Sequence, residues 1–79
     1  MSPTVLRVGP YRLFFYSREE SKMHIHIEES NNTAKFWLEP VELAESHGFS
    51  TRDLNKLEGI VSANKKHIIK EWREFHGEN

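Results

Sequence analysis

Two histidines separated by one residue, His24 and His26, are the side chains of this chain whose type and spacing could do chemistry. Imidazole titrates near neutral pH, so it serves as a general acid or a general base. On a strand, alternate residues share a face and lie ~6.6–7 Å apart, which lets two imidazoles flank one phosphate. The pair therefore predicts a metal-independent ribonuclease with His24 and His26 as acid and base, as one of two readings.

Zinc is an alternative use of the same pair, because His-x-His on a strand can chelate this metal. Glu28, His47, His67 or His76 would have to complete the shell, and none is a firm third ligand. Basic neighbours also oppose a bound cation, so we expect no metal and no cofactor. The sequence has no glycine-rich phosphate loop, nucleophile elbow or paired cysteines. Whether the chain is an enzyme stays open, with a binding module favoured.

The histidines fall in a segment, residues 22–28, that alternates polar and apolar side chains and so predicts a strand with one buried face. Further strands are predicted at 4–8, 11–16 and 33–38, joined by short turns. Pro40 and Gly48 flank a predicted short helix at 40–47, and an apolar stripe predicts a long helix at 51–76. We expect one α+β domain over 1–79, a four-stranded antiparallel β-meander packed on one face by the short and the long C-terminal helix (ββββαα).

The register follows from requiring apolar residues to share one face of the sheet, which we call the inner face. This pairs His24 with Trp37 and His26 with Lys35 on one side. On the other side it pairs Phe14 with His24 and Arg12 with His26. The expected inner face contains Leu6, Val8, Tyr11, Leu13, Phe15, Met23, Ile25, Ile27, Ala34, Phe36 and Leu38.

The opposite, outer face then carries two rows of side chains that cross the strands. One is a basic row of Arg7, Arg12, His26 and Lys35, and the next is a largely aromatic row of Val5, Phe14, His24 and Trp37. Single-stranded RNA binds such sheets by stacking bases on rings and holding phosphates with basic groups, and protein interfaces are enriched in the same residues. The predicted binding residues are Arg7, Arg12, Phe14, Tyr16, Lys35 and Trp37. The long helix has a second basic sector, opposite its apolar stripe, that is either solvated or contacts an acidic partner: Arg52, Lys56, Lys66, Lys70 and Arg73.

Charge and length limit the partners that we expect. The formal net charge of −1 argues against general electrostatic binding of nucleic acid. No cysteine, signal sequence or membrane span is evident, so a cytoplasmic chain without a membrane partner is expected. A helix of about 26 residues spans ~39 Å, whereas the strands span only ~20–23 Å. We therefore expect a helix that bends near Gly59 or one that overhangs the sheet, and favour a homodimer through that overhang or through the outer face.

Several runs of the sequence together resemble a family of small bacterial proteins of unknown function, numbered 4160 in the unknown-function series. The runs are residues 3–9, 11–17, 24–26 and 34–44. The resemblance implies a short protein inside the cell, with a partner protein encoded by an adjacent gene, as in toxin–antitoxin pairs. It implies no activity. Many members carry Pro-Pro before the first histidine, where this chain has Ser21, Lys22 and Met23.

Overall fold

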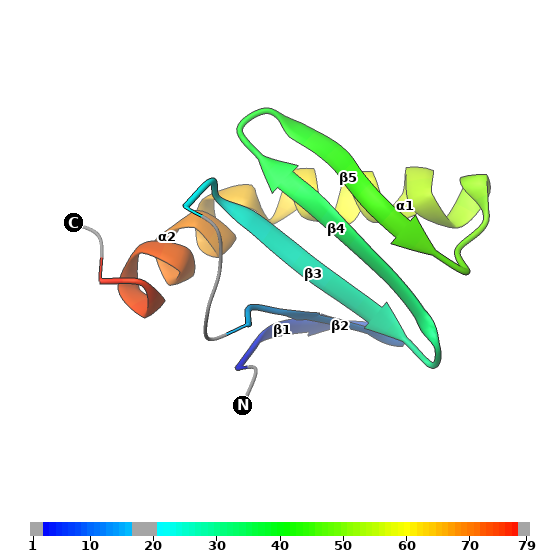
Figure 1. The fold of residues 1–79 in the computed structure, drawn as a ribbon, viewed down its shortest axis with the longest axis horizontal. Helices are drawn as coiled ribbons and strands as arrows, with labels where there is room; N and C mark the ends of the chain where they lie inside the picture. Colours follow the sequence, from blue (N-terminus) through cyan, green and yellow to red (C-terminus); the bar gives the residue numbers. More distant parts are fainter. Residues whose placement is uncertain (1–2, 17–20, 78–79) are drawn as a thin grey trace.

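The computed structural model describes residues 3–16 and 21–77 of the chain. Five strands form one antiparallel sheet in which neighbours in sequence are neighbours in space, and two helices follow (Figure 1). The α+β class and the meander are thus confirmed, but the sheet has five strands where four were predicted. The elements are β1 (Thr4–Val8), β2 (Tyr11–Phe14), β3 (His24–Glu29), β4 (Asn32–Leu38), β5 (Val41–His47), α1 (Thr51–Ala63) and α2 (Lys65–Phe75).

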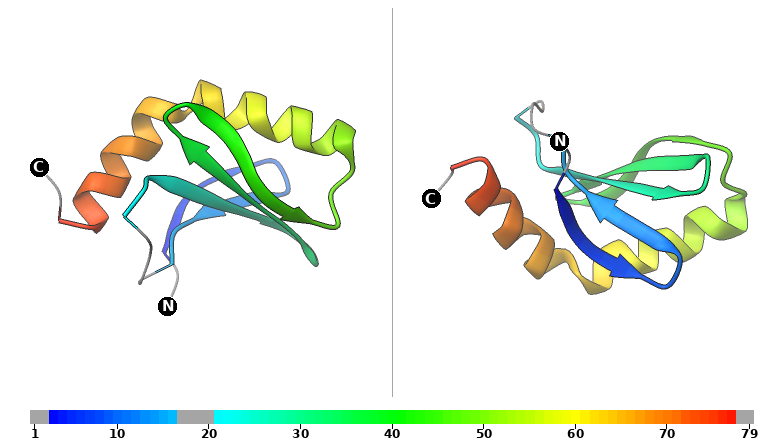
Figure 2. Two further views of the ribbon diagram at one scale, coloured as in Figure 1. Left: turned by 45° about the horizontal axis from the view of Figure 1, so that its top comes forward. Right: turned by 90° about the horizontal axis from the view of Figure 1, so that it is seen from below.

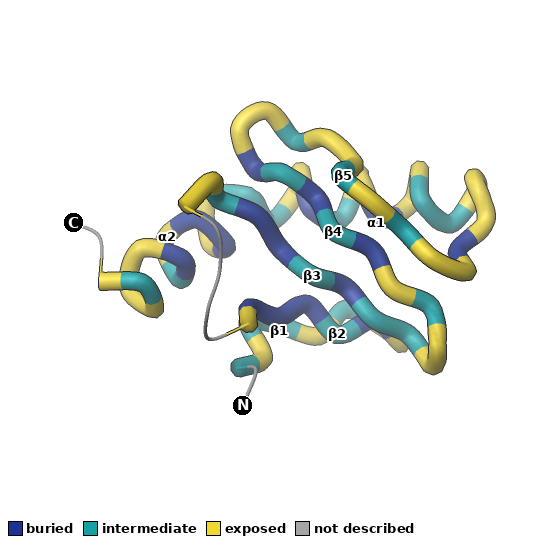
Figure 3. Tube along the Cα trace, in the orientation of Figure 1, coloured by how far each residue is buried: buried dark blue, intermediate teal, exposed yellow. Residues whose placement is uncertain are grey.

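The core lies between the inner face of the sheet and the two helices, which together form a bent rod along that face (Figure 2). All eleven residues predicted for the inner face belong to this core or pack against it. The helices add Leu57, Val61, Ile68, Ile69 and Trp72. Strand β4, and β3 from Ile25 to Glu28, alternate between buried and less buried residues (Figure 3), as expected for strands with one covered face. No helix in the described part of the chain is long and apolar enough to cross a membrane.

The predicted short helix at 40–47 is wrong, because this segment forms β5 at the edge of the sheet. Glu39 and Pro40, joined by a cis peptide bond, make the two-residue turn from β4 into β5. Gly48 follows the strand with a φ of 89°, so its freedom to adopt positive φ ends a strand rather than a helix. Pairing with β4 satisfies the backbone of this segment, and that tertiary contact outweighs its weak helical pattern.

The predicted long helix at 51–76 is interrupted at Asn64, which separates α1 from α2. Ser50 caps the N-terminus of α1, where its Oγ accepts a hydrogen bond from the Asp53 amide at 3.1 Å. Asn64 has φ −110° and ψ 11°, and its side-chain amide donates to the Ile60 carbonyl at 2.8 Å. This local bond competes with the helical pattern. The helix thus bends, as one of the two alternatives predicted, but at Asn64 rather than near Gly59. The bend lets α2 follow the sheet, so the other alternative, an overhang, does not occur.

The register is as predicted between β3 and β4, where His24 pairs with Trp37 and His26 with Lys35. Between β2 and β3 it differs by two residues: Phe14 pairs with His26, and Arg12 pairs with Glu28. A shift of two keeps every side chain on its face, so face matching cannot detect it. Between β1 and β2, Arg7 pairs with Arg12 as expected, but an irregularity places Thr4, not Val5, opposite Phe14.

Candidate binding face

The outer face is built from rows of side chains that cross the strands, and the shift between β2 and β3 reorders these rows. One row now reads Arg7, Arg12, Glu28, Thr33, His47, and the next reads Thr4, Phe14, His26, Lys35, Glu45. The predicted basic row of Arg7, Arg12, His26 and Lys35 is therefore wrong. Because β5 is a strand, its Glu45 and His47 extend the outer face by one strand beyond β4, the last strand predicted from the sequence.

Aromatic rings gather at the centre of this face, as predicted, although with different neighbours. The Tyr16 ring lies edge-on to the His26 ring with centroids 4.5 Å apart, and Phe14 stacks against His26 at 5.6 Å. Tyr16 also meets Phe14 edge-on at 5.2 Å. Phe14 is 3% exposed beneath these rings, so it supports the face from below, whereas Tyr16 is 49% exposed and offers a surface to a partner.

His24 has no exposed surface, in contrast to its predicted place on an open face. Its ring meets His26 edge-on at 5.0 Å, Trp37 at 5.7 Å, and Trp72 of α2 at 5.0 Å. Its Nδ1 lies 2.7 Å from the Lys22 carbonyl oxygen, and since a carbonyl only accepts, Nδ1 must donate there. In this arrangement His24 orients its neighbours, while His26, partly exposed, is the histidine that a ligand could contact.

Arg12 is engaged in contacts within the face, which limits its use for a ligand. Its Nη1 donates to Glu28 Oε2 at 3.1 Å, and its Nε donates to Thr4 Oγ1 at 2.7 Å. The guanidinium carbon also lies 4.4 Å from the centre of the Phe14 ring, a cation–π contact. Arg7, its partner across β1 and β2, is exposed.

Trp37 is contacted by two lysine side chains. The ammonium of Lys22 lies 4.4 Å and that of Lys35 4.5 Å from the centre of the indole ring system. These contacts hold positive charge beside an aromatic ring, the combination predicted for this face. The predicted residues Tyr16, His26, Lys35 and Trp37 are thus brought close to one another, but Arg7 and Arg12 lie in a separate row.

A hollow of about 160 Å³ opens on the outer face beside Tyr16 and His26. Its rim includes Lys35 from β4 and, from β5, Glu45 and His47. Glu45 and His47 were not predicted to belong to this face, because their segment was predicted to be a helix. The pattern that could have indicated a strand here is the alternation of apolar and polar residues from Val41. A β-bulge interrupts this alternation, because Lys35 pairs with Glu45 but Phe36 pairs with Leu43.

The charges around the hollow are mixed. Lys35 faces Glu45 across β4 and β5, and Trp37 faces Glu42. Across residues 3–16 and 21–77, no three histidine or acidic side chains are grouped in a way that would hold a metal ion. The arrangement presents rings, a histidine and charges of both signs to a ligand on a shallow surface.

Comparison with known protein families identifies the family to which this five-stranded domain belongs. The family model described as a domain of unknown function, DUF4160, matches residues 11–73, so the chain belongs to this family. The match confirms the family resemblance of the sequence and covers β2 to most of α2. Searches of curated proteins and of solved structures found no match.

Proposed function

We propose that this chain is a binding module that contacts a protein partner through the outer face of its sheet. The observation that carries the proposal is the exposed Tyr16 ring beside a hollow whose rim joins His26, Lys35 and Glu45 from three strands. Exposed tyrosine next to charged groups is typical of protein interfaces, where a rigid ring fills a pocket of the partner.

A protein partner fits the charges better than nucleic acid does. Glu28, Glu42 and Glu45 stand among the basic residues of the outer face, and carboxylates repel a phosphate backbone. A protein surface can match both signs of charge at once. The family resemblance supplies the candidate, a small protein encoded by the adjacent gene of a two-gene system of toxin–antitoxin type. A second copy of this chain, as in the predicted homodimer, would contact the same face.

Co-expression with the adjacent gene product tests this proposal directly. We expect the two proteins to elute together in size-exclusion chromatography and to bind in titration calorimetry. Tyr16→Ala and Lys35→Glu should each weaken binding about tenfold or more, because interface rings and paired charges contribute on the order of 1–3 kcal/mol. Arg52→Glu, an exposed change on α1, should leave the affinity within twofold.

Two outcomes would contradict the proposal. One is a complex whose affinity is the same for all three variants, since the contact would then lie elsewhere. The other is an interaction with host extract that nuclease treatment abolishes, which would identify nucleic acid as the ligand.

The ribonuclease is the second candidate, favoured by the grouping of His26, Lys35, Glu45 and His47 around one hollow. His26 could act as general acid or base there, and Lys35 could stabilise the charge of a phosphorane. His24 would serve only to orient His26, because it is buried. We expect the purified chain to cleave a labelled RNA no faster than His26→Ala does. Cleavage that this substitution abolishes would instead establish the enzyme.

A further inference from the structure

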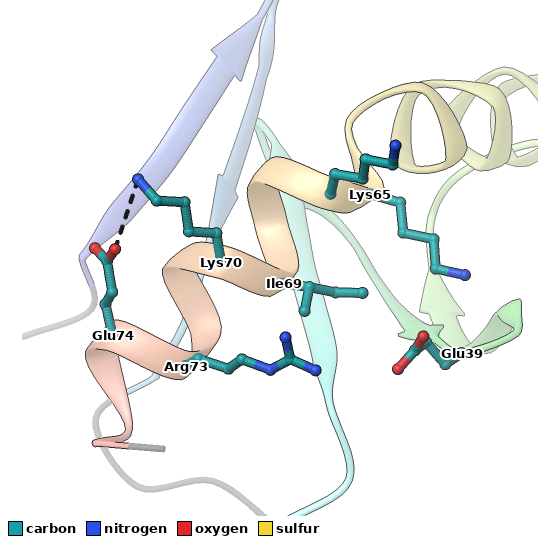
Figure 4. A pocket seen from close by; sticks show the side chains of 7 residues that line it. Glu39, Lys65, Ile69, Lys70, Arg73 and Glu74 are labelled. Carbon is teal, nitrogen blue, oxygen red and sulfur yellow. Dashed lines mark ion pairs between the residues drawn. The ribbon is translucent and has the colours of Figure 1, made fainter. Parts of the chain in front are cut away.

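A second concave surface lies away from the outer face, between α2 and the turn that joins β4 to β5. We call it the α2 groove. It has a volume of about 600 Å³, and its lining comes from Glu39 of the turn and from residues of α2 (Figure 4). Cavities of roughly 300–1,000 Å³ hold a ligand the size of several side chains. The groove is thus large enough for a short peptide segment.

The α2 groove is predominantly basic, because its lining includes Lys65, Lys66, Lys70 and Arg73 against the two carboxylates of Glu39 and Glu74. Lys70 forms an ion pair with Glu74 at 3.6 Å, one turn along the helix. Within the described residues, Lys66 and Arg73 have no such ion pair. These cations gather in a chain whose net charge is −1, so the groove is a local site of positive charge that the overall charge conceals.

Ile69 contributes apolar surface to the same groove. In Figure 4 the Arg73 side chain extends along α2 towards Glu39, and Ile69 projects into the space between them. The stems of lysine and arginine add further apolar surface below their charged ends. A ligand would therefore meet an apolar floor with a mainly basic rim.

From this juxtaposition we propose that the α2 groove binds an acidic, amphipathic peptide segment of a protein partner. One apolar side chain of the segment packs over Ile69, and flanking carboxylates pair with Lys66 and Arg73. Glu39 accepts hydrogen bonds from backbone N–H groups of the segment. A nucleic acid fits less well, because it has no apolar side chain to pack on the floor of the groove.

Selection from a display library of random twelve-residue peptides tests the proposal without a known partner. The folded full-length chain serves as bait, next to two charge-matched variants. The groove variant, Lys66→Glu with Arg73→Glu, replaces two positive charges of the α2 groove by negative ones. The α1 variant, Arg52→Glu with Lys56→Glu, makes the same change of charge at exposed positions of α1. We expect wild type and the α1 variant to enrich peptides with acidic residues around an apolar one. The groove variant should bind these peptides about tenfold or more weakly, because two attractive ion pairs become repulsive.

Glu39→Gln should change the affinity in the opposite direction. The Gln amide oxygen can still accept the backbone hydrogen bonds, while loss of the negative charge removes its repulsion of the peptide carboxylates. Binding of an enriched acidic peptide should therefore tighten by about two- to threefold. The peptide should also shift the NMR signals of the Ile69 methyl groups while leaving those of Tyr16 and His26 unchanged. This last readout separates the α2 groove from the outer face, so either proposal can fail alone.

Three results would overturn the inference. Enriched peptides could lack an acidic and apolar pattern, or they could bind the groove variant as tightly as wild type. In the third, the library yields no binder, while a labelled twelve-nucleotide DNA strand binds wild type and not the groove variant. The groove would then be a phosphate-binding surface.

Discussion

At the scale of single residues, Arg12 stabilises the outer face through three contacts with its neighbours. It pairs with Glu28, donates to Thr4 and covers the Phe14 ring. The Arg12 side chain is 19% exposed and that of Glu28 is 40% exposed, so solvent weakens their attraction only in part. The register that places them opposite each other also keeps Phe14 buried.

Replacing Arg12 with Ala should therefore lower the free energy of unfolding by about 1–2 kcal/mol, through loss of charge-assisted hydrogen bonds and of cover for Phe14. Arg7→Ala is the matched control, because Arg7 is exposed and faces Arg12 across the two strands. Like charges opposite each other are unfavourable, so this change should be neutral or slightly stabilising. Urea denaturation measures both values. An equal loss for the two variants would contradict this role of Arg12.

The residues of the candidate site were predicted from sequence as members of a face, but not in their degree of burial. Alternation assigns His24, His26, Lys35 and Trp37 correctly to one side of β3 and β4. The alternation gives no information on which other parts of the chain cover these side chains. His24 is buried because Trp72, 48 positions away in the chain, reaches it from α2, and a contact between such distant residues has no local signal.

At the scale of elements, β5 shows why a short amphipathic segment is ambiguous from sequence. Residues 41–47 contain Val, Leu and Ala at spacings that fit two turns of helix, and Pro40 and Gly48 are typical helix boundaries. The β-bulge near Ala44 hides the alternation that would have indicated a strand. The long strongly periodic segment 51–76 was predicted well except for its break, since Asn64 acts through one side-chain bond.

Replacing either of two glycines by alanine should change the stability of the chain in opposite directions: Gly48 directly follows β5, and Gly59 lies within α1. Gly48 has positive φ, and a Cβ there would collide with the Asn32 side chain. Gly48→Ala should therefore lower the free energy of unfolding by about 1–3 kcal/mol. Gly59 lies in α1, and a Cβ added there would meet open space. Gly59→Ala should therefore raise the free energy of unfolding by about 0.5–1 kcal/mol.

Thermal denaturation followed by circular dichroism measures both glycine variants under one set of conditions. A tolerated Gly48→Ala would contradict the turn between β5 and α1, because a strand that ends differently would not need positive φ there. A destabilising Gly59→Ala would contradict the exposed placement of that residue on α1.

At the scale of the whole molecule, the bend at Asn64 divides a helix that would be too long for the sheet into α1 and α2, and α2 packs over one end of the sheet. Ile68, Ile69 and Trp72 are buried within the single chain, whereas an overhanging helix would have left them to a second copy. The homodimer proposal therefore loses its helix argument and depends on the outer face. Phe75, 40% exposed, remains the large apolar residue of α2 that a partner could cover.

Because α2 packs over the end of the sheet, we expect it to contribute much of the stability of this small domain. Trp72 is 1% exposed and contacts two rings of the sheet region, Phe15 next to β2 at 5.4 Å and His24 of β3 at 5.0 Å. Trp72→Ala should cost about 3–5 kcal/mol, a large share of the roughly 4–12 kcal/mol expected for a chain of this length. Phe75→Ala, which removes a half-exposed ring from the same helix, should cost about 1 kcal/mol.

Urea denaturation followed by circular dichroism at 222 nm separates these two variants without depending on tryptophan fluorescence. If Trp72→Ala cost no more than Phe75→Ala, α2 would not be packed against the sheet as described. His24 would then be exposed at the end of β3 and available beside His26, and the two-histidine acid and base pair would regain the geometry that the ribonuclease requires. The stability of one helix thus decides which chemistry the outer face can perform.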